Sequence, residues 1–124
     1  MTARSCCEQL SDWALGLTAA DIPTDLQNDA RYRVLDVIGN ILAGSREPLG
    51  AAMLKAAPLF GSGSEACALP SGQRLPAATA ALVNGTFGHA LDYDDTHNAT
   101  LVHPSVPTIA TALALAEPLA LNGQ

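Results

Sequence analysis

The chain has 124 residues, enough for one domain or part of one and too few for several. Apolar residues make up 48% of the sequence and charged residues 15%, a composition that excludes an intrinsically disordered chain. Six Lys and Arg against twelve Asp and Glu give a net charge of −6, which argues against binding to nucleic acid or to an anionic membrane surface.

The cysteines and the apolar segments bear on where the protein works. Cys6 and Cys7 are adjacent and Cys67 is far from both, so they form neither a disulfide framework nor a CxxC metal pair. The first ten residues lack a signal peptide, and the longest apolar run, residues 106–121, is too short and too interrupted to span a bilayer. We therefore expect a cytoplasmic protein with no membrane partner.

Alanine dominates the apolar residues, with 23 alanines against only five aromatic residues. Alanine-rich faces let helices approach closely but leave much small apolar surface to cover. We expect this surface to pack against further chain or against a partner subunit.

Two capping boxes predict the first two helices. Ser5 and Glu8 have the Ser-x-x-Glu spacing, and the apolar residues after them recur at helical intervals along one stripe. Thr24 and Gln27 form the second pair and open a longer helix that we expect to end at Gly44. Its predicted apolar face consists of Leu26, Ala30, Val34, Val37, Ile38, Ile41 and Leu42. Its predicted solvated face consists of Asp25, Asp29, Arg33, Asp36 and Asn40.

Prolines mark the remaining elements. Pro48 suits the first turn of a short third helix, and residues 67–69 are expected to form a brief extended segment before a turn at residues 70–72. Residues 77–90 form an apolar helical pattern, and a last helix follows Pro104. The predicted fold class is therefore mainly α, a helical-bundle segment of a larger all-helical domain.

The polar chemistry of the chain is concentrated between the last two predicted helices. Residues 89–97, His-Ala-Leu-Asp-Tyr-Asp-Asp-Thr-His, contain two histidines and three carboxylates, and His103 follows just before the last helix. Residues 75–124 contain no Lys or Arg. Imidazoles and carboxylates this close together are suited to proton transfer near neutral pH.

Three interpretations of this segment compete. A metal site would use the same His and Asp side chains, but their spacing does not match standard zinc sites, and hard divalent ions prefer a cage of oxygen ligands. Asp92-x-Asp94-x-Thr96 matches the DxDxT motif of magnesium-dependent phosphohydrolases, but that motif needs a buried β-strand before it, which residues 84–91 do not resemble. The third interpretation is general acid and base catalysis without a metal, centred on His103.

The same segment resembles a known family. Residues 84–97 (Asn-Gly-Thr-Phe-Gly-His-Ala-Leu-Asp-Tyr-Asp-Asp-Thr-His), His103-Pro-Ser and residues 112–117 are similar to the signature of the 2-methylcitrate dehydratase family (MmgE/PrpD), which also contains cis-aconitate decarboxylases and an iminodisuccinate epimerase. Residues 36–44 also resemble the family's N-terminal region. Because family members are several times longer, the resemblance implies that residues 1–124 are the N-terminal portion of a large helical domain, with the remainder of the enzyme absent.

The resemblance implies roles for individual residues. His103 would exchange a proton at a carbon next to a carboxylate, and Asp92 would orient or polarise a neighbouring group. Thr96 is the third active-site residue that the resemblance implies, and its hydroxyl would hold a substrate carboxylate together with the amides at the helix start near Ser105. We add His97 and Ser105 to Thr96 as candidate substrate-binding residues. No metal and no cofactor is implied. The partners would be a small polycarboxylic acid and, in full-length relatives, a second copy of the chain as a homodimer.

The other polar residues of the segment have structural interpretations. We expect His89 to be buried and hydrogen-bonded, and Asp94 and Asp95 to cap and brace the loop. A polycarboxylate also needs cations, and because this half of the chain has none, we expect them to come from later sequence.

The predicted function is that of a fragment of a metal-independent lyase or isomerase, acting on a small polycarboxylic acid by proton transfer next to a carboxylate. By itself the chain is expected to be inactive. Two alternatives stay open, a non-catalytic helical interaction module and a magnesium-dependent phosphohydrolase.

Overall fold

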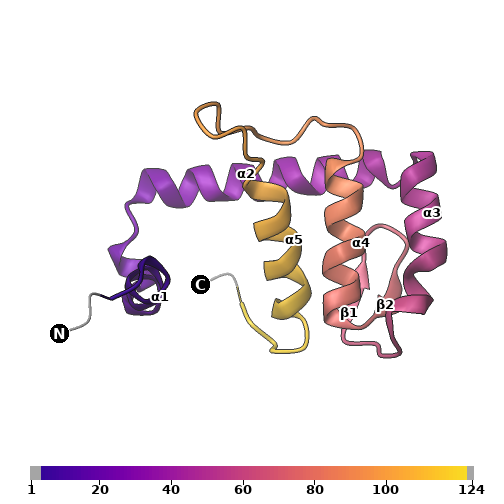
Figure 1. The fold of residues 1–124 in the computed structure, drawn as a ribbon, viewed down its shortest axis with the longest axis horizontal. Helices are drawn as coiled ribbons and strands as arrows, with labels where there is room; N and C mark the ends of the chain where they lie inside the picture. The colour runs from indigo at the N-terminus through magenta and orange to yellow at the C-terminus, as the bar shows by residue number, and fades with distance from the viewer. Residues whose placement is uncertain (1–3, 123–124) are drawn as a thin grey trace.

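The computed structural model describes residues 4–122 and is mainly α-helical (Figure 1), which confirms the predicted fold class. The helices are α1 (Cys6–Gly16), α2 (Thr24–Gly44), α3 (Pro48–Ala56), α4 (Ala77–His89) and α5 (Ser105–Ala116), with short 3-10 turns at Ala19–Asp21 and Ala57–Phe60. The strands β1 (Ala66–Ala68) and β2 (Gln73–Leu75) form a two-stranded antiparallel hairpin.

Helix α4 is the centre of the arrangement. In Figure 1, α3, α4 and α5 lie side by side, and the long helix α2 crosses their ends. Contacts join α4 to α2, α3, α5 and the hairpin. The largest fully buried side chains are Phe87, Ile41, Val37, Val83 and Asn84, from α2 and α4. The core therefore lies around α4, and the loop that follows α4 starts from a helix that is packed on several sides.

Two glycines allow other helices to approach α4 closely. A Cβ atom at Gly44, the last residue of α2, would lie 2.0 Å from the carbonyl oxygen of Phe87. A Cβ atom at Gly88 would lie 2.9 Å from Cγ1 of Val106 in α5. The small residues thus bring α2 and α5 directly against the backbone of α4.

The first predicted capping box is confirmed. The Ser5 hydroxyl oxygen accepts a hydrogen bond from the Glu8 amide at 3.2 Å, and the Glu8 carboxylate accepts one from the Ser5 amide at 2.8 Å. This backbone hydrogen bond, followed by one from the Ser5 hydroxyl, lowers the pKa of Glu8.

The second predicted capping box is wrong. Pro23, not Thr24, occupies the N-cap position of α2, so the threonine is already within the first turn and caps nothing. The Gln27 side chain instead donates to the carbonyl oxygen atoms of Ala19 and Ile22, at 3.3 and 2.8 Å. These bonds tie the start of α2 to the preceding 3-10 turn.

The predicted extended segment is one strand of the hairpin, and Asn84 ties it to α4. The buried Asn84 side chain accepts a hydrogen bond from the Leu69 amide at 2.8 Å and donates one to the Cys67 carbonyl at 3.0 Å. Glu117, just after α5, accepts from the Cys67 amide at 2.8 Å and pairs with Arg74 of β2. Polar contacts therefore join the hairpin both to α4 and to the residue that follows α5.

Much apolar surface is uncovered, as the composition predicts. No residue of α1 is buried, and Figure 1 shows this helix apart from the others. Leu10 and Trp13 expose 63% and 62% of their surface. The apolar face of α2 is covered only toward its C-terminus, because Val37 and Ile41 are buried whereas Leu26 is exposed. No helix in residues 4–122 is long and apolar enough to cross a membrane.

Candidate active site

The loop between α4 and α5 folds back over the end of α4 and gathers four polar side chains. Each of His89, Asp92, Asp94 and His103 offers one imidazole nitrogen or carboxylate oxygen atom, and these four atoms lie within 4.8 Å of one another. The chain turns at Asp92, whose φ of 55° lies in the left-handed region that Asp tolerates better than most residues. We call these four residues the His/Asp cluster.

Asp94 is at the centre of the His/Asp cluster. Its side chain is only 1% exposed, and its Oδ1 and Oδ2 atoms lie 2.9 and 3.2 Å from Nδ1 of His89. Its Oδ2 atom also lies 3.4 Å from Nδ1 of His103. The two imidazole rings meet edge to face, with centroids 5.0 Å apart. A buried carboxylate is costly unless it is paired, so Asp94 holds both histidines around it.

The two ring nitrogens of His103 face different surroundings. Nδ1 is buried and makes no hydrogen bond to any residue that the structure describes. Nε2 lies 3.8 Å from Oδ1 of Asp92, whose side chain is 78% exposed. His103 thus has a buried side toward Asp94 and an open side toward Asp92. An imidazole held in this way can take up or release a proton at Nε2.

Asp95 braces the start of α5, as predicted. Its Oδ1 accepts a hydrogen bond from the Ser105 amide at 3.1 Å and its Oδ2 one from the Ser105 hydroxyl at 2.7 Å. Arg33 of α2 also pairs with Asp95 Oδ2, at 2.6 Å. Arg33 is exposed, as predicted for the solvated face of α2, but its long side chain also reaches a loop that lies 62 residues away in the sequence. Hydrogen bonding to Asp29 and, to a smaller extent, the charge of Asp95 raise the pKa of Arg33.

The predicted substrate-binding residues Thr96 and His97 lie on the exposed part of the loop, outside the His/Asp cluster. Nδ1 of His97 is 2.8 Å from the Thr100 hydroxyl oxygen, and the His97 backbone forms an antiparallel bridge with Val102. These contacts close a turn just before His103. Of the residues predicted to touch the substrate, the structure brings Asp92 and His103 together.

Ser105, the third predicted substrate-binding residue, is buried in the first turn of α5. Both its amide and its hydroxyl donate to Asp95. Pro107 contributes no N–H group. The helix start therefore offers fewer free donors to a substrate carboxylate than the sequence suggested, and binding at Ser105 stays a prediction.

Sequence reasoning left His89 and Asp94 out of the site. His89 is hydrogen-bonded as expected, but it is not buried, since its side chain is 56% exposed. It is the last residue of α4, so the loop covers its Nδ1 and leaves the rest of the ring open. The sequence does contain a feature that could have placed them in the site. His89 and Asp94 are five residues apart across the end of a helix, and this spacing allows the carboxylate to fold back onto the imidazole ring.

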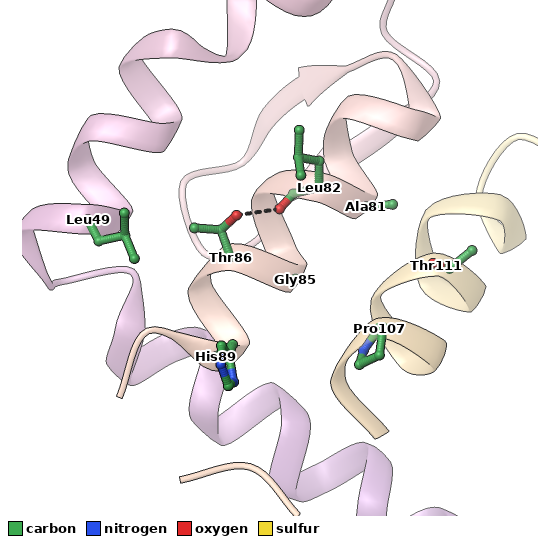
Figure 2. Close-up of a pocket in the computed structure, with 8 residues that line it drawn as sticks. All are labelled: Leu49, Ala81, Leu82, Gly85, Thr86, His89, Pro107 and Thr111. Atoms are coloured by element: carbon green, nitrogen blue, oxygen red, sulfur yellow. Dashed lines mark hydrogen bonds between the residues drawn. The ribbon is translucent and has the colours of Figure 1, made fainter. Parts of the chain in front are cut away.

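A groove between α4 and α5 leads to the His/Asp cluster. Its larger part, about 460 Å³, is lined by Leu49, Ala81, Leu82, Gly85, Thr86, His89, Pro107 and Thr111 (Figure 2). An adjoining hollow of about 330 Å³ shares Gly85, His89 and Pro107 and reaches Asp94 and His103. The mostly apolar groove therefore meets the polar cluster at His89.

The His/Asp cluster also has the donor set of a divalent metal site, with two nitrogens and two oxygens. Two of these residues, His89 and Asp94, are already hydrogen-bonded to each other. The motif Asp92-x-Asp94-x-Thr96 follows helix α4 instead of the buried strand that a phosphohydrolase requires. The surroundings of the motif therefore do not match that alternative.

Comparison with known proteins agrees with the family resemblance noted in the sequence. Residues 8–124 match the family model of the MmgE/PrpD N-terminal domain. The cis-aconitate decarboxylase of Aspergillus terreus is 29% identical over 116 residues, which are 94% of this chain and 24% of that protein. The cis-aconitate decarboxylase-like protein oryM of Aspergillus oryzae is 29% identical over 109 residues, 88% of this chain and 23% of that protein. The chain thus spans about a quarter of the length of these relatives. No solved structure matches it.

Proposed function

Because the chain belongs to the MmgE/PrpD family, we propose that it supplies part of the active site of a lyase or isomerase that acts on a small polycarboxylic acid. The reaction would move a proton at a carbon next to a carboxylate. The observation that carries this proposal is the setting of His103, with Nδ1 buried against Asp94 and Nε2 open beside Asp92. The two relatives named for cis-aconitate decarboxylation support the substrate class.

In this proposal Nε2 of His103 is the atom that exchanges the proton. In a dehydration, the neutral imidazole takes the proton from carbon, and the electron pair left behind forms the double bond as the neighbouring hydroxyl group leaves. In a decarboxylation, carbon dioxide leaves and the electron pair that remains on carbon takes the proton from the imidazolium. Asp92, on the open side of the ring, orients or polarises a neighbouring group, and Thr96 and His97, further along the same loop, contact the substrate.

Substrate binding needs cations, and residues 75–124, which carry the loop, contain no Lys or Arg. Arg33 is near the loop, but Asp29 and Asp95 both pair with it. Further Lys, Arg or His side chains from elsewhere are therefore part of the proposal, and residues 1–124 alone are expected to be inactive. We further propose a cytoplasmic homodimer as the working form. The free thiols of Cys6, Cys7 and Cys67 fit a reducing compartment, and the uncovered apolar faces fit a subunit interface.

The test uses the full-length protein that includes residues 1–124. The protein is incubated in D2O with cis-aconitate and with 2-methylcitrate, and NMR follows the products. In a decarboxylation, deuterium is expected at a carbon next to a carboxylate, whereas in a dehydration the product is expected to have lost the hydrogen from that carbon. His103→Ala should lower turnover by about a hundredfold, the usual scale for losing a general acid or base, with little change in melting temperature. Asp36→Asn, on the exposed face of α2, is the matched control. Near-normal turnover of a folded His103→Ala variant would contradict the assignment.

A second candidate function, metal-dependent hydrolysis, is favoured by the four ligand-type atoms that lie within 4.8 Å of one another. Metal analysis of protein purified without chelator separates the two functions. Our proposal expects no stoichiometric Mg²⁺ or Zn²⁺ and unchanged turnover after treatment with EDTA. Stoichiometric metal, together with loss of activity on chelation and on Asp94→Asn, would favour the metal-dependent reaction.

A further inference from the structure

We propose that Asp94 is the positioning residue of His103 and that His89 holds Asp94 in place. This inference rests on the proposed function, because it explains what prepares Nε2 of His103 for proton transfer. It assigns a role to the one carboxylate of the loop whose side chain is removed from water, and to the exposed histidine at the end of α4.

The first argument is the charge balance around Asp94. Its side chain is 1% exposed, and within residues 4–122 its ion pairs are to His89 and His103. Arg33, which pairs with the neighbouring Asp95, pairs also with Asp29 and not with Asp94. A buried carboxylate needs N–H donors, and here the two imidazoles are placed to supply them.

The second argument is the direction of the rings. Both Nδ1 atoms converge on the same carboxylate, at 2.9 Å for His89 and 3.4 Å for His103. An ionised carboxylate only accepts hydrogen bonds, so each Nδ1 is favoured to carry a hydrogen. An unprotonated Nδ1 on His103 would instead set lone pair against lone pair at a buried position. The resulting tautomer leaves the lone pair on Nε2, the atom on the open side.

The third argument is the contrast between the two neighbouring carboxylates. Asp92 is exposed and lies 3.8 Å from Nε2, where the substrate would bind. Asp94 lies behind the ring, and its distance of 3.4 Å to Nδ1 is slightly longer than a hydrogen bond. Hydrogen bonds of catalytic groups commonly tighten when the substrate binds. Asp94 therefore acts through His103, whereas Asp92 faces the reaction itself.

The first measurement uses the unmodified protein. Selective ¹⁵N labelling of histidine in the full-length protein reports the tautomer of each imidazole, and His103→Gln identifies the His103 signals by their loss. We expect neutral His103 to carry its hydrogen on Nδ1. If neutral His103 carries its hydrogen on Nε2, the inference is overturned, whatever the activity of the protein.

The second measurement compares variants at Asp94. Asp94→Asn keeps the size of the side chain but presents an amide donor, so His103 should shift toward the Nε2–H tautomer. We expect kcat to fall about a hundredfold, as for other small misplacements of a reacting group, with KM changed less than about threefold. Asp94→Glu, which keeps the carboxylate, should recover part of kcat. Asp36→Asn is the control and should change neither quantity.

Two results at Asp94 would overturn the inference: an unchanged tautomer in Asp94→Asn, or a changed tautomer with unchanged kcat. Failure of the proposed function has a different signature. If the unmodified protein turns over no polycarboxylate, the function fails, while the tautomers of the unmodified protein and of Asp94→Asn still decide whether Asp94 orients His103.

Discussion

Two residues of the loop that carries the site adopt a backbone conformation that most side chains avoid. Asp92 and Leu101 both have a φ of 55°, one just after α4 and the other two residues before His103. For a residue such as Leu this conformation costs about 1–2 kcal/mol. Contacts elsewhere in the loop, including those of Asp95 with Ser105, must offset that cost. The position of His103 is thus set by the packing of the whole loop.

The close approach of α2 to α4 at Gly44 leads to a residue-scale prediction. Gly44→Ala would place a Cβ atom 2.0 Å from the Phe87 carbonyl oxygen, so α2 and α4 must separate. We expect a loss of about 1–3 kcal/mol in the free energy of unfolding, as for other overpacked cores. Gly39→Ala is the matched control in the same helix. It meets nothing within 4 Å and should stabilise the protein by about 0.5–1 kcal/mol. The melting temperatures of the two variants check both expectations. A Gly44→Ala variant as stable as Gly39→Ala would contradict the close contact of α2 with α4 at Gly44.

The residues of the site were predictable only where local sequence carries the information. The run from His89 to His103 is dense in imidazoles and carboxylates, which marks the segment, and the family resemblance selects Asp92 and His103 within it. The central position of Asp94 depends on the left-handed turn at Asp92, which no local pattern specified. The contact of Arg33 with Asp95 depends on how α2 crosses the loop, and that is a property of tertiary packing.

At the scale of the elements, α1 leads to a prediction about pH. The Ser5 amide, and then the Ser5 hydroxyl, hold the pKa of Glu8 below its usual value of 4.5. The capping contribution is therefore fully present above pH 4.5 and is lost as the pH falls through the lowered pKa of the folded state. We expect α1 to fray from its N-terminus in this range, which ¹³Cα chemical shifts detect.

The control for this prediction is Glu8→Gln, which removes the ionisation. The helicity of α1 in this variant should depend less on pH than in the unmodified chain. If both proteins lose α1 helicity along the same pH profile, the ionisation of Glu8 is not the cause of the fraying.

Most helix ends were predictable because the residues that set them act locally. Pro48 lies in the first turn of α3, and Pro76 and Pro104 occupy the N-cap positions of α4 and α5. The packing of the hairpin was harder to predict from the sequence. Its turn was visible in the sequence, but the Asn84 side chain that joins the hairpin to α4 comes from the following helix. The false capping box at Thr24 shows that a four-residue pattern does not decide which residue is the N-cap.

At the scale of the whole molecule, the described residues form a core around α4 with open apolar faces at its periphery. α1 has no buried residue, and the start of α2 is equally uncovered. Exposed apolar faces of helices commonly bind other protein surfaces. The groove between α4 and α5 has the same character, and its polar end is the His/Asp cluster. We therefore propose that the site and the uncovered surfaces both pack against further protein.

The polypeptide of residues 1–124, produced by itself, is accordingly expected to be mainly helical but to self-associate. Circular dichroism should report the helices, whereas sedimentation should show oligomers and ANS should bind, because large side chains such as Leu10, Trp13 and Leu15 face water. Replacing Leu10 and Trp13 by Lys should reduce the association without loss of helix signal. Leu59→Lys, at an apolar residue that is 85% exposed and lies on the 3-10 turn after α3, is the comparison for a single apolar residue outside the α1 face. A monomer that binds no ANS and melts in one sharp transition would show that these faces need no cover.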